Sequence, residues 1–279
     1  SSPVTGVQTC ALPIWKTYGV FMEEILSVQN LKKQFRLSYK QQKLQRTDKK
    51  VITAVDNLSF TVNRGEIFGL LGPNGAGKTT TLRMLATLIS PDSGDAFIEG
   101  HSVVKEPDKV RSKIGFLTGE LKLEDFFTPN YLFNFFSDLY GVEETVRNAR
   151  KRALFSRFGI DRFAEVKLAN LSTGMKQKVS LVISVVNDPD FIIFDEPTNG
   201  LDVLTAKTVT DFLLELKAQG KTIILSTHIF SLVEKICDRA GIIIGGRLVA
   251  LDTVAELTKD KNLEDVFFDI YAEVSGGVS

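Results

Sequence analysis

Apolar and polar residues alternate along the chain in a pattern that predicts strands and helices in turn. Residues 25–35 (ILSVQNLKKQF) predict a short edge strand, and residues 51–62 (VITAVDNLSFTV) alternate as a second strand. Short apolar runs, which are typical of buried strands, are EIFGLL at 66–71, FIIFDE at 191–196 and TIILST at 222–227. Helical patterns follow at 78–88 and 203–220, and the glycine pair at 245–246 predicts a closing hairpin. This order of elements is typical of an α/β fold.

Residues 120–170 interrupt the alternation with an aromatic-rich, helix-like block. Thr128 and Pro129 predict the start of a helix, because Thr is a preferred N-cap and Pro is favoured at the first helical position. We expect most aromatic side chains of this block to form a core, and a contact with a partner protein is the alternative. These side chains are Phe126, Phe127, Tyr131, Phe133, Phe135, Phe136 and Tyr140. The block predicts an α-helical subdomain inserted in the α/β core.

Residues 36–50 (RLSYKQQKLQRTDKK) form a polar stretch between the first two predicted strands. The stretch contains six basic residues and one acid. Its simplest interpretation is a solvated loop that joins the strands. A basic contact with lipid head groups is the alternative.

Composition narrows the class of protein. The chain has 279 residues with 43% apolar residues, enough for one large domain or two small ones with a real core. Lys and Arg total 34, as do Asp and Glu, and this balance argues against a general nucleic-acid binder and a strongly basic membrane-surface protein. No apolar run approaches the roughly 18 residues that indicate a transmembrane helix. We expect a soluble chain whose membrane role comes through a partner.

The first residues differ in kind from the rest. Residues 4–14 (VTGVQTCALPI) resemble the in-frame translation of a common sequencing-library adapter. We therefore expect residues 1–21 to be a non-native scar, Met22 to be the natural start, and residues 22–279 to form one domain. Cys237 is then the only native cysteine, which suits a small core residue in a reducing, cytoplasmic compartment.

A glycine-rich loop between a predicted strand and a predicted helix matches the phosphate-binding pattern G-x-x-x-x-G-K-[ST]. Its glycines let successive backbone N–H groups curl around phosphate oxygens, and the helix N-terminus adds partial positive charge. Lys78 would reach the β- and γ-phosphates, and Thr79 would ligate Mg²⁺. The nucleotide-binding residues predicted in this loop are Gly72, Pro73, Asn74, Gly75, Ala76, Gly77, Lys78, Thr79 and Thr80.

FIIFDE places two carboxylates at the end of an apolar strand. Asp195 would hold Mg²⁺, and Glu196 would act as the base that polarises a water in line with the γ-phosphate. His228 follows TIILST at the carboxyl end of another strand, where open α/β sheets bind their ligands, and would donate to a γ-phosphate oxygen. With Lys78, these residues predict nucleotide hydrolysis and not binding alone.

Together these motifs resemble the nucleotide-binding domain of ABC transporters, over residues 24 to about 270. The glycine-rich loop matches that family's Walker A motif, FIIFDE its Walker B strand, and His228 its switch histidine. TNGLD at 198–202 matches the D-loop, and LSTGM at 171–175 matches the signature. The resemblance implies a P-loop NTPase (RecA-like) core with an N-terminal antiparallel β subdomain and an inserted α-helical subdomain. It also implies that Phe35 stacks on adenine.

In the family, a pair of cassettes sandwiches ATP and Mg²⁺, and the signature of each cassette caps the γ-phosphate held by the other. The resemblance therefore implies that Ser172 and Gly174 contact the nucleotide of a second copy in a homodimer. It also implies an integral membrane permease as partner, no nucleic-acid partner, and a peripheral position on the cytoplasmic face of the cell membrane.

Two departures from the family pattern stand out. Thr173 and Met175 occupy signature positions where the family has glycine and glutamine. The lost neutral hydrogen bond would cost about 0.5–1.5 kcal/mol, and a left-handed Thr173 would add ~1–2 kcal/mol. In IGFLTGE, Gly119 takes the place of a glutamine that senses Mg²⁺, and the adjacent Glu120 is its candidate replacement. Both departures, with MLATLISPDSG and LTGELKL, resemble the sodium-extrusion subgroup of ABC-2-type exporters.

We therefore expect the ATPase subunit of an ABC exporter, with sodium as the implied cargo. The main alternative is a non-transport ABC ATPase of the translation or DNA-repair type. The chain has a single cassette and no heptad run, and both features argue against this alternative. LSTGMKQK ahead of FIIFDE argues against a P-loop kinase or GTPase. Intact Lys78, Asp195, Glu196 and His228 argue against a degenerate cassette. The chain ends soon after NLEDVFFDIYAE, and we expect no appended regulatory domain.

Overall fold

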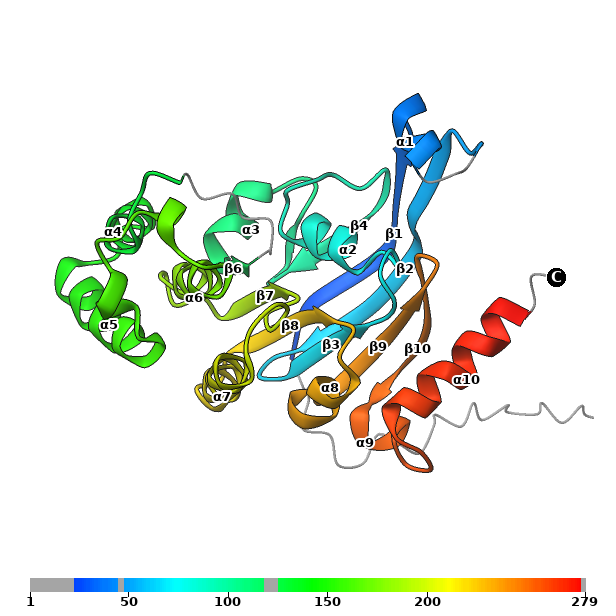
Figure 1. Cartoon of the computed structure of the whole chain (residues 1–279). Coiled ribbons are helices and arrows are strands. Elements are labelled where there is room, and N and C mark those ends of the chain that lie inside the picture. The colour runs from blue at the N-terminus through cyan, green and yellow to red at the C-terminus, as the bar shows by residue number, and fades with distance from the viewer. Residues whose placement is uncertain (1–22, 45–47, 118–124, 277–279) are drawn as a thin grey trace, which may run out of the picture.

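The computed structural model describes residues 23–44, 48–117 and 125–276. Within these ranges the chain forms two sheets with helices packed around them (Figure 1). The predicted adapter scar at residues 1–21 lies outside the described residues.

An antiparallel sheet with the strand order β2-β1-β4-β5 contains the first part of the fold. Its strands are β1 (Glu24–Arg36), β2 (Val51–Asn63), β4 (Ser93–Ile98) and β5 (His101–Ser102). The strand predicted at 25–35 is confirmed, but β1 pairs with both β2 and β4, so its predicted place at the edge of a sheet is wrong. Its second neighbour comes from a distant part of the chain, which the local pattern does not reveal.

The second sheet has the order β10-β9-β3-β8-β7-β6. Its strands are β3 (Ile67–Leu71), β6 (Ile114–Leu117), β7 (Phe191–Asp195), β8 (Thr222–Thr227), β9 (Arg239–Ile244) and β10 (Arg247–Thr253). All pairs are parallel except β9 with β10, which form the predicted hairpin. Gly245 and Gly246 both have positive φ angles, 57° and 83°, which is the backbone that a tight two-residue hairpin turn requires.

Helices connect and cover the strands. They are α1 (Tyr39–Leu44), α2 (Lys78–Leu85), α3 (Pro107–Lys113), α4 (Pro129–Leu139), α5 (Glu144–Phe158), α6 (Thr173–Ser184), α7 (Val203–Ala218), α8 (Phe230–Ile236), α9 (Val254–Leu257) and α10 (Leu263–Gly276), with 3₁₀ turns at Ile160–Phe163 and Leu168–Asn170. α2 ends before the predicted residue 88, because Thr87 adopts a positive φ of 60°. α1 lies in the stretch interpreted as a loop, so that interpretation is wrong for these residues. None of the described helices is both long and apolar enough to cross a membrane.

Successive side chains of the parallel sheet point to opposite faces and pack into two separate hydrophobic cores. Phe68 and Leu70 of β3 join the core that α2 and the antiparallel sheet share, whereas Ile67 and Leu71 join the core beneath α6, α7 and α8. The ring of Phe60 on β2 stacks on Phe68 with 5.3 Å between centroids, and so links the two sheets. Because β3 is buried on both faces, the loop that follows it has a fixed position.

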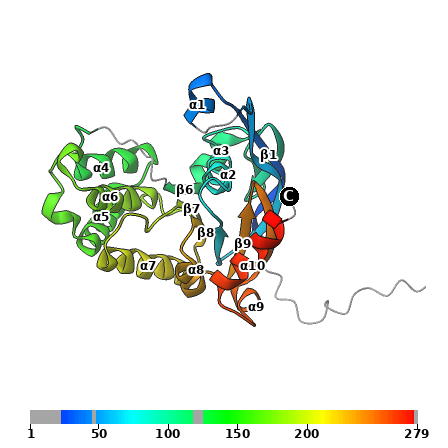
Figure 2. The ribbon, with the colours of Figure 1, turned by 45° about the vertical axis from the view of Figure 1, so that its right-hand side comes forward.

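The helices α4, α5 and α6 lie together to one side of the sheets (Figure 2). Thr128 caps α4 as predicted, with its side chain accepting a hydrogen bond from the backbone N–H of Tyr131. Phe133 is fully buried, whereas Tyr131 and Phe135 are 48% exposed. The expectation of an aromatic core therefore holds for Phe133, and for Phe127 and Phe136, which pack against the same core. It is wrong for the exposed residues Phe126, Tyr131, Phe135 and Tyr140.

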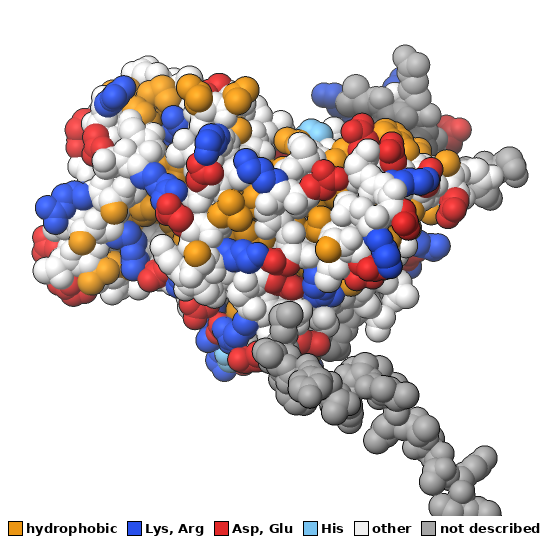
Figure 3. Space-filling model, turned by 90° about the horizontal axis from the view of Figure 1, so that it is seen from below, with side chains coloured by type: hydrophobic (Ala, Val, Ile, Leu, Met, Phe, Trp, Pro, Cys, Tyr) orange, Lys and Arg blue, Asp and Glu red, His pale blue; other side chains and the backbone are white. Residues whose placement is uncertain are grey.

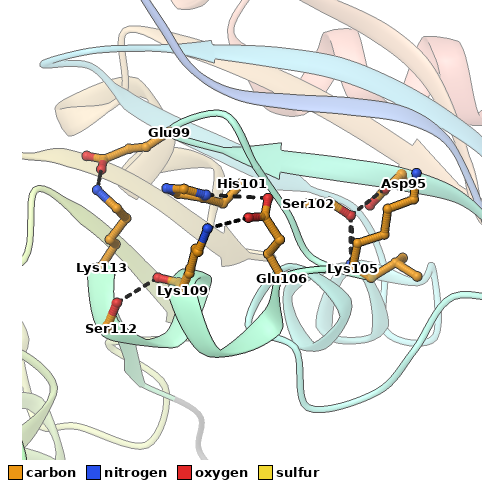
Figure 4. A network of polar contacts seen from close by, with 10 residues as sticks. Asp95, Glu99, His101, Ser102, Lys105, Glu106, Lys109, Ser112 and Lys113 are labelled. Carbon is orange, nitrogen blue, oxygen red and sulfur yellow. Dashed lines mark hydrogen bonds and ion pairs between the residues drawn. The ribbon is translucent and has the colours of Figure 1, made fainter.

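Polar contacts fasten α3 to the turn between β4 and β5 (Figure 4). The Ser102 hydroxyl donates to Asp95 at 2.6 Å, and Glu106 at the start of α3 accepts from Lys109 at 2.7 Å. The ring of His101 faces the same Glu106 carboxylate at 3.4 Å. The His101–Glu106 contact and the ion pair of Lys113 with Glu99 join the two ends of α3, and therefore the start of β6, to the antiparallel sheet and its turn.

Candidate functional site

Three loops meet at one edge of the parallel sheet. They follow β3, β7 and β8, which are neighbours in the order β3-β8-β7, so the carboxyl ends of these strands lie side by side. This edge is where open α/β sheets bind ligands. A cavity of about 500 Å³ opens there. Its lining residues are Phe35, Ala54, Asn74, Gly75, Ala76, Gly77, Lys78, Thr79, Thr80, Glu196, Asn199 and His228.

The glycine-rich loop presents backbone rather than side chains to the cavity. Gly77 has a φ of 107°, and a Cβ atom there would lie 2.3 Å from the carbonyl oxygen of Ala54, so only glycine fits. α2 starts at the next residue, and no side chain in the described part of the chain caps its first N–H groups. Unpaired N–H groups at a helix start favour an anion, and this cradle therefore fits the phosphates of a nucleotide.

Lys78 is buried in this cradle, with 5% of its side chain exposed. Its Nζ donates to the carbonyl oxygens of Gly72 at 2.6 Å and Pro73 at 3.1 Å, and lies 3.8 Å from Oε1 of Glu196. Burial lowers the pKa of the Lys78 ammonium group, and the charges of Glu196 and Asp195 oppose that shift. The carbonyl oxygens of Gly72 and Pro73 therefore contact Lys78, and neither residue is among those that line the cavity. The ammonium group is held where an anion in the loop would lie beside it.

Thr79 and Asp195 come together as predicted for a metal site. The Thr79 hydroxyl donates to Oδ1 of Asp195 at 3.0 Å, and the Ser226 hydroxyl donates to the same oxygen at 2.6 Å. Sequence reasoning missed Ser226, and the only available signal was its place at the end of TIILST. Register pairs it with Asp195 across β8 and β7.

This donor set suits Mg²⁺, which takes few protein ligands and completes its shell with water and phosphate oxygens. A hydroxyl and a carboxylate oxygen are both hard ligands of the required kind. Among the described residues no cluster of three or more His, Cys, Asp or Glu side chains could hold a metal by itself. Thr79 and Asp195 therefore offer two of the ligands that Mg²⁺ takes, and phosphate oxygens and water could supply the rest.

Glu196 and His228 form the next pair. Nδ1 of His228 lies 3.0 Å from both carboxylate oxygens, but only Oε1 has hydrogen-bond geometry. Oε2 is buried without a hydrogen-bond partner among the described residues. Glu196 also has a φ of 51°, which is rare for a residue other than glycine. Strain and an unsatisfied buried oxygen at one residue are typical of a functional site.

Phe35 lies at the rim of the same cavity, at the end of β1. Its ring is 41% exposed, and Nζ of Lys33 lies 5.8 Å from the ring centroid. An exposed aromatic face beside a phosphate cradle suits a planar base. Ala54, which the sequence did not single out, and Asn199, which lies in the TNGLD segment but was not predicted to bind nucleotide, complete the wall.

Ser172 and Gly174 are not among the residues that line this cavity. Ser172 is the N-cap of α6, where its hydroxyl accepts from the backbone N–H of Met175 at 3.3 Å. Thr173 is the first residue of α6 and has no positive φ, so the strain considered for a left-handed Thr173 does not arise. Met175 packs against the hydrophobic core. The start of α6 is therefore a regular, capped helix terminus.

The two residues at the second departure, Gly119 and Glu120, lie outside the described residues. Whether Glu120 replaces the Mg²⁺-sensing glutamine stays a prediction.

Similar proteins share both the sequence and the fold. A sequence model of the family described as ABC transporter matches residues 55–199. The ABC transporter ATP-binding protein NatA of Bacillus subtilis (strain 168) is 37% identical over 232 residues, which cover 83% of this chain and 94% of NatA. The Nod factor export ATP-binding protein I of Ralstonia nicotianae is 36% identical over 239 residues, covering 86% of this chain and 70% of that protein.

Solved structures agree. An ATP-binding subunit of an ABC transporter has a TM-score of 0.77 at 28% identity, and the match covers 88% of this chain and 99% of that chain. A dimeric ATP-binding cassette in a post-hydrolysis state, bound to ADP and Pi, has a TM-score of 0.72 at 24% identity, with coverages of 82% and 98%. The predicted fold class, a P-loop NTPase core with an antiparallel β subdomain and an α-helical subdomain, is confirmed.

Proposed function

Because this chain belongs to the ABC transporter family and is an ATPase of that family, we propose that it drives an exporter as a homodimer beside a separate integral membrane subunit. Export is named for several similar proteins, among them the Nod factor export ATP-binding protein I of Ralstonia nicotianae. The observation that carries the proposal is the convergence of Lys78, the Thr79–Asp195 pair and the Glu196–His228 pair at one cavity.

Binding is the task of the backbone cradle and Lys78. The N–H groups at the start of α2 would hold phosphate oxygens, and Lys78 would exchange its carbonyl contacts for them. Thr79 and Asp195 would hold Mg²⁺, and Phe35 would stack on the adenine. When bound, Mg²⁺–ATP supplies the bond to be broken and the metal charge that offsets negative charge on the transferred phosphoryl group.

Hydrolysis is the task of Glu196 and His228. Oε2 of Glu196 would accept a proton from the attacking water, because it is buried and has no hydrogen-bond partner among the described residues. His228 holds the other oxygen and so fixes the carboxylate. The backbone N–H of Glu196 also donates hydrogen bonds to the carbonyl and hydroxyl oxygens of Ser226, each at 3.2 Å. The base would therefore be oriented before the water arrives.

The signature segment would serve a second copy of the chain. Ser172 and Gly174 lie at the N-terminus of α6 and are not among the residues that line the cavity of their own chain. This helix N-terminus would instead contact the γ-phosphate that the other copy holds. The N-cap hydroxyl and the helix N-terminus remain available for this purpose although Thr173 and Met175 depart from the family pattern. The fold likeness to a dimeric cassette supports a dimer.

A membrane subunit would contact the helical block, for which we propose the bounds 120–170. Tyr131, Phe135 and Leu139, each four residues apart, leave an exposed apolar stripe along α4. A cavity of about 190 Å³ lies next to it, and its lining includes Phe136. This contact would place the chain on the cytoplasmic face of the membrane. Sodium is the cargo that the resemblance to sodium-extrusion exporters implies.

The test of the ATPase site is Glu196→Gln. Without the carboxylate base we expect ATP hydrolysis to fall by at least about a hundredfold, the lower range for general-base catalysis. ATP should then accumulate in a stable dimer, measured by size-exclusion chromatography with and without ATP.

The matched control is Glu264→Gln, which removes one exposed carboxylate at the start of α10 and should leave the rate unchanged. Hydrolysis by Glu196→Gln near the parental rate would contradict the role of Glu196. Sodium uptake by inverted vesicles that contain the membrane subunit tests the cargo. ATP-driven transport of another solute without sodium would reject sodium and leave the ATPase proposal intact.

A further inference from the structure

The far end of the β1–β2 hairpin concentrates charge of one sign. We define this basic tip by its described residues, 36–44 and 48–51. Its basic residues are Arg36, Lys40, Lys43, Lys49 and Lys50, and its acid is Asp48; all six side chains are exposed. Over the whole chain, acidic and basic residues balance at 34 each. The excess at the tip is therefore a local concentration and does not reflect the composition of the chain.

The basic tip differs from the rest of the hairpin in its ion pairs. Closer to its base, Lys33 pairs with Asp92 at 2.9 Å and Lys32 with Asp56 at 3.4 Å. Among the residues that the structure describes, Arg36, Lys40 and Lys50 take part in no ion pair. These charges are not neutralised within the described part of the protein.

The tip also offers an amphipathic ring. Tyr39 at the start of α1 is 71% exposed, and Nζ of Lys43 lies 4.9 Å from its ring centroid. Val51, where β2 begins, is exposed as well. Basic side chains next to an exposed tyrosine are typical of the region where a protein meets the surface of a bilayer.

The position of the tip leaves it accessible. α1 stands clear of the two sheets in Figures 1 and 2. The opposite side of the molecule looks different, because acidic and basic side chains lie intermingled over the face in Figure 3. Phe35 at the base of the tip lines the nucleotide cavity, whereas Lys40, Lys43 and Lys50 do not. The tip charges are therefore available for a contact outside this cavity.

We propose that the basic tip binds the anionic phospholipid head groups of the membrane beside which this ATPase works. Long, flexible ammonium groups suit a surface of many similar anions better than one shaped partner, and each basic residue near such a surface adds about fivefold to binding. The inference rests on the proposed function only for the position of the chain beside a membrane. The binding itself belongs to the chain alone.

The test is co-sedimentation of the purified protein with phospholipid vesicles. We expect binding to phosphatidylcholine vesicles that contain phosphatidylglycerol, little binding to phosphatidylcholine alone, and release by salt, because exposed charges are screened. The triple variant Lys40→Glu, Lys43→Glu and Lys50→Glu should lose at least about tenfold in affinity for the anionic vesicles. Its ATPase rate in solution should stay at the parental level.

The matched control reverses three exposed basic residues of the helical block, Arg152→Glu, Arg162→Glu and Lys167→Glu. It changes net charge by the same amount, on elements that lie away from α1 (Figure 1). An equal loss in this control would overturn the proposal, since net charge alone would then explain binding. The proposal would also be overturned if the parent protein bound anionic vesicles only in the presence of a membrane subunit. That result would indicate an acidic protein loop as the partner of the tip. Absent ATPase activity would count against the proposed function and leave the lipid measurement valid.

Discussion

Lys78 is a buried cation whose partners are carbonyl oxygens that an anion can replace. Its Nζ donates to Gly72 and Pro73, and burial lowers the pKa of the ammonium group. An ion that has already lost its water gives up little further hydration when a phosphate arrives, so its attraction to that phosphate is strong. The loop therefore holds the Lys78 ammonium group in place for a phosphate partner.

At this scale we expect Lys78→Ala to weaken ATP binding by roughly ten- to hundredfold, since a hydrogen bond to a charged group contributes about 1.5–3 kcal/mol. Isothermal titration calorimetry with Mg²⁺–ATP measures the change. Lys105→Ala, which removes an exposed lysine outside the cavity, should bind as the parent does. Unchanged affinity in Lys78→Ala would reject the assignment of the loop.

Among the elements, α6 combines a structural role with a proposed binding role at one terminus. Ser172 caps the helix by accepting from the N–H of Met175, in the way that Thr128 caps α4 by accepting from the N–H of Tyr131. The two caps are chemically alike, with distances of 3.3 Å and 3.2 Å. They differ in that the start of α6 would also face the nucleotide of a second copy.

Ser172→Ala and Thr128→Ala therefore make a matched pair. Each should lower the free energy of unfolding by about 1 kcal/mol, the usual value of such a cap, measured by urea unfolding. Only Ser172→Ala should also slow ATP hydrolysis and weaken the ATP-dependent dimer, while ATP binding by the single chain stays unchanged. A similar loss of hydrolysis in both variants would mean that helix stability, and not a contact across a dimer, explains the effect.

At the scale of the whole molecule, the burial of Cys237 reflects the close packing of α8 against the parallel sheet. The residue follows α8 and is buried in the core beneath that helix. A Cβ atom added to Gly69 of β3 would lie 3.1 Å from its Sγ, so the thiol fills the space that this glycine leaves. Burial, and secondarily the charge of Asp238, raise the pKa of the thiol far above its usual 9.0.

This shift predicts how stability depends on pH. In the unfolded chain the thiol ionises above about pH 9, whereas in the folded chain it stays protonated. Its contribution to the free energy of unfolding is therefore complete below pH 9 and declines above it, by up to about 1.4 kcal/mol per pH unit. Urea unfolding of the parent and of Cys237→Ala on both sides of pH 9 measures the difference, and equal slopes would contradict the burial of the thiol.

The sequence by itself determined the elements whose signals are local. Strand β7 and the carboxylates that end it follow from an apolar run closed by Asp195 and Glu196. The hairpin at Gly245 and Gly246 and the Thr128 cap also came out as predicted, because turn and cap chemistry depend on neighbouring residues. The α/β class followed from the order of these elements, and the resemblance carried by the motifs implied the P-loop NTPase core that the similar structures confirm.

Only the tertiary structure decided which distant residues meet. It made β1 an interior strand by bringing β4 beside it, placed Ser226 on Asp195 through the register of β8 with β7, and left Oε2 of Glu196 buried without a hydrogen-bond partner among the described residues. It also exposed Phe135 on α4. The physical reason is common to all four: pairing, register and burial depend on what the rest of the chain packs against a residue, and a local pattern carries no record of that neighbour.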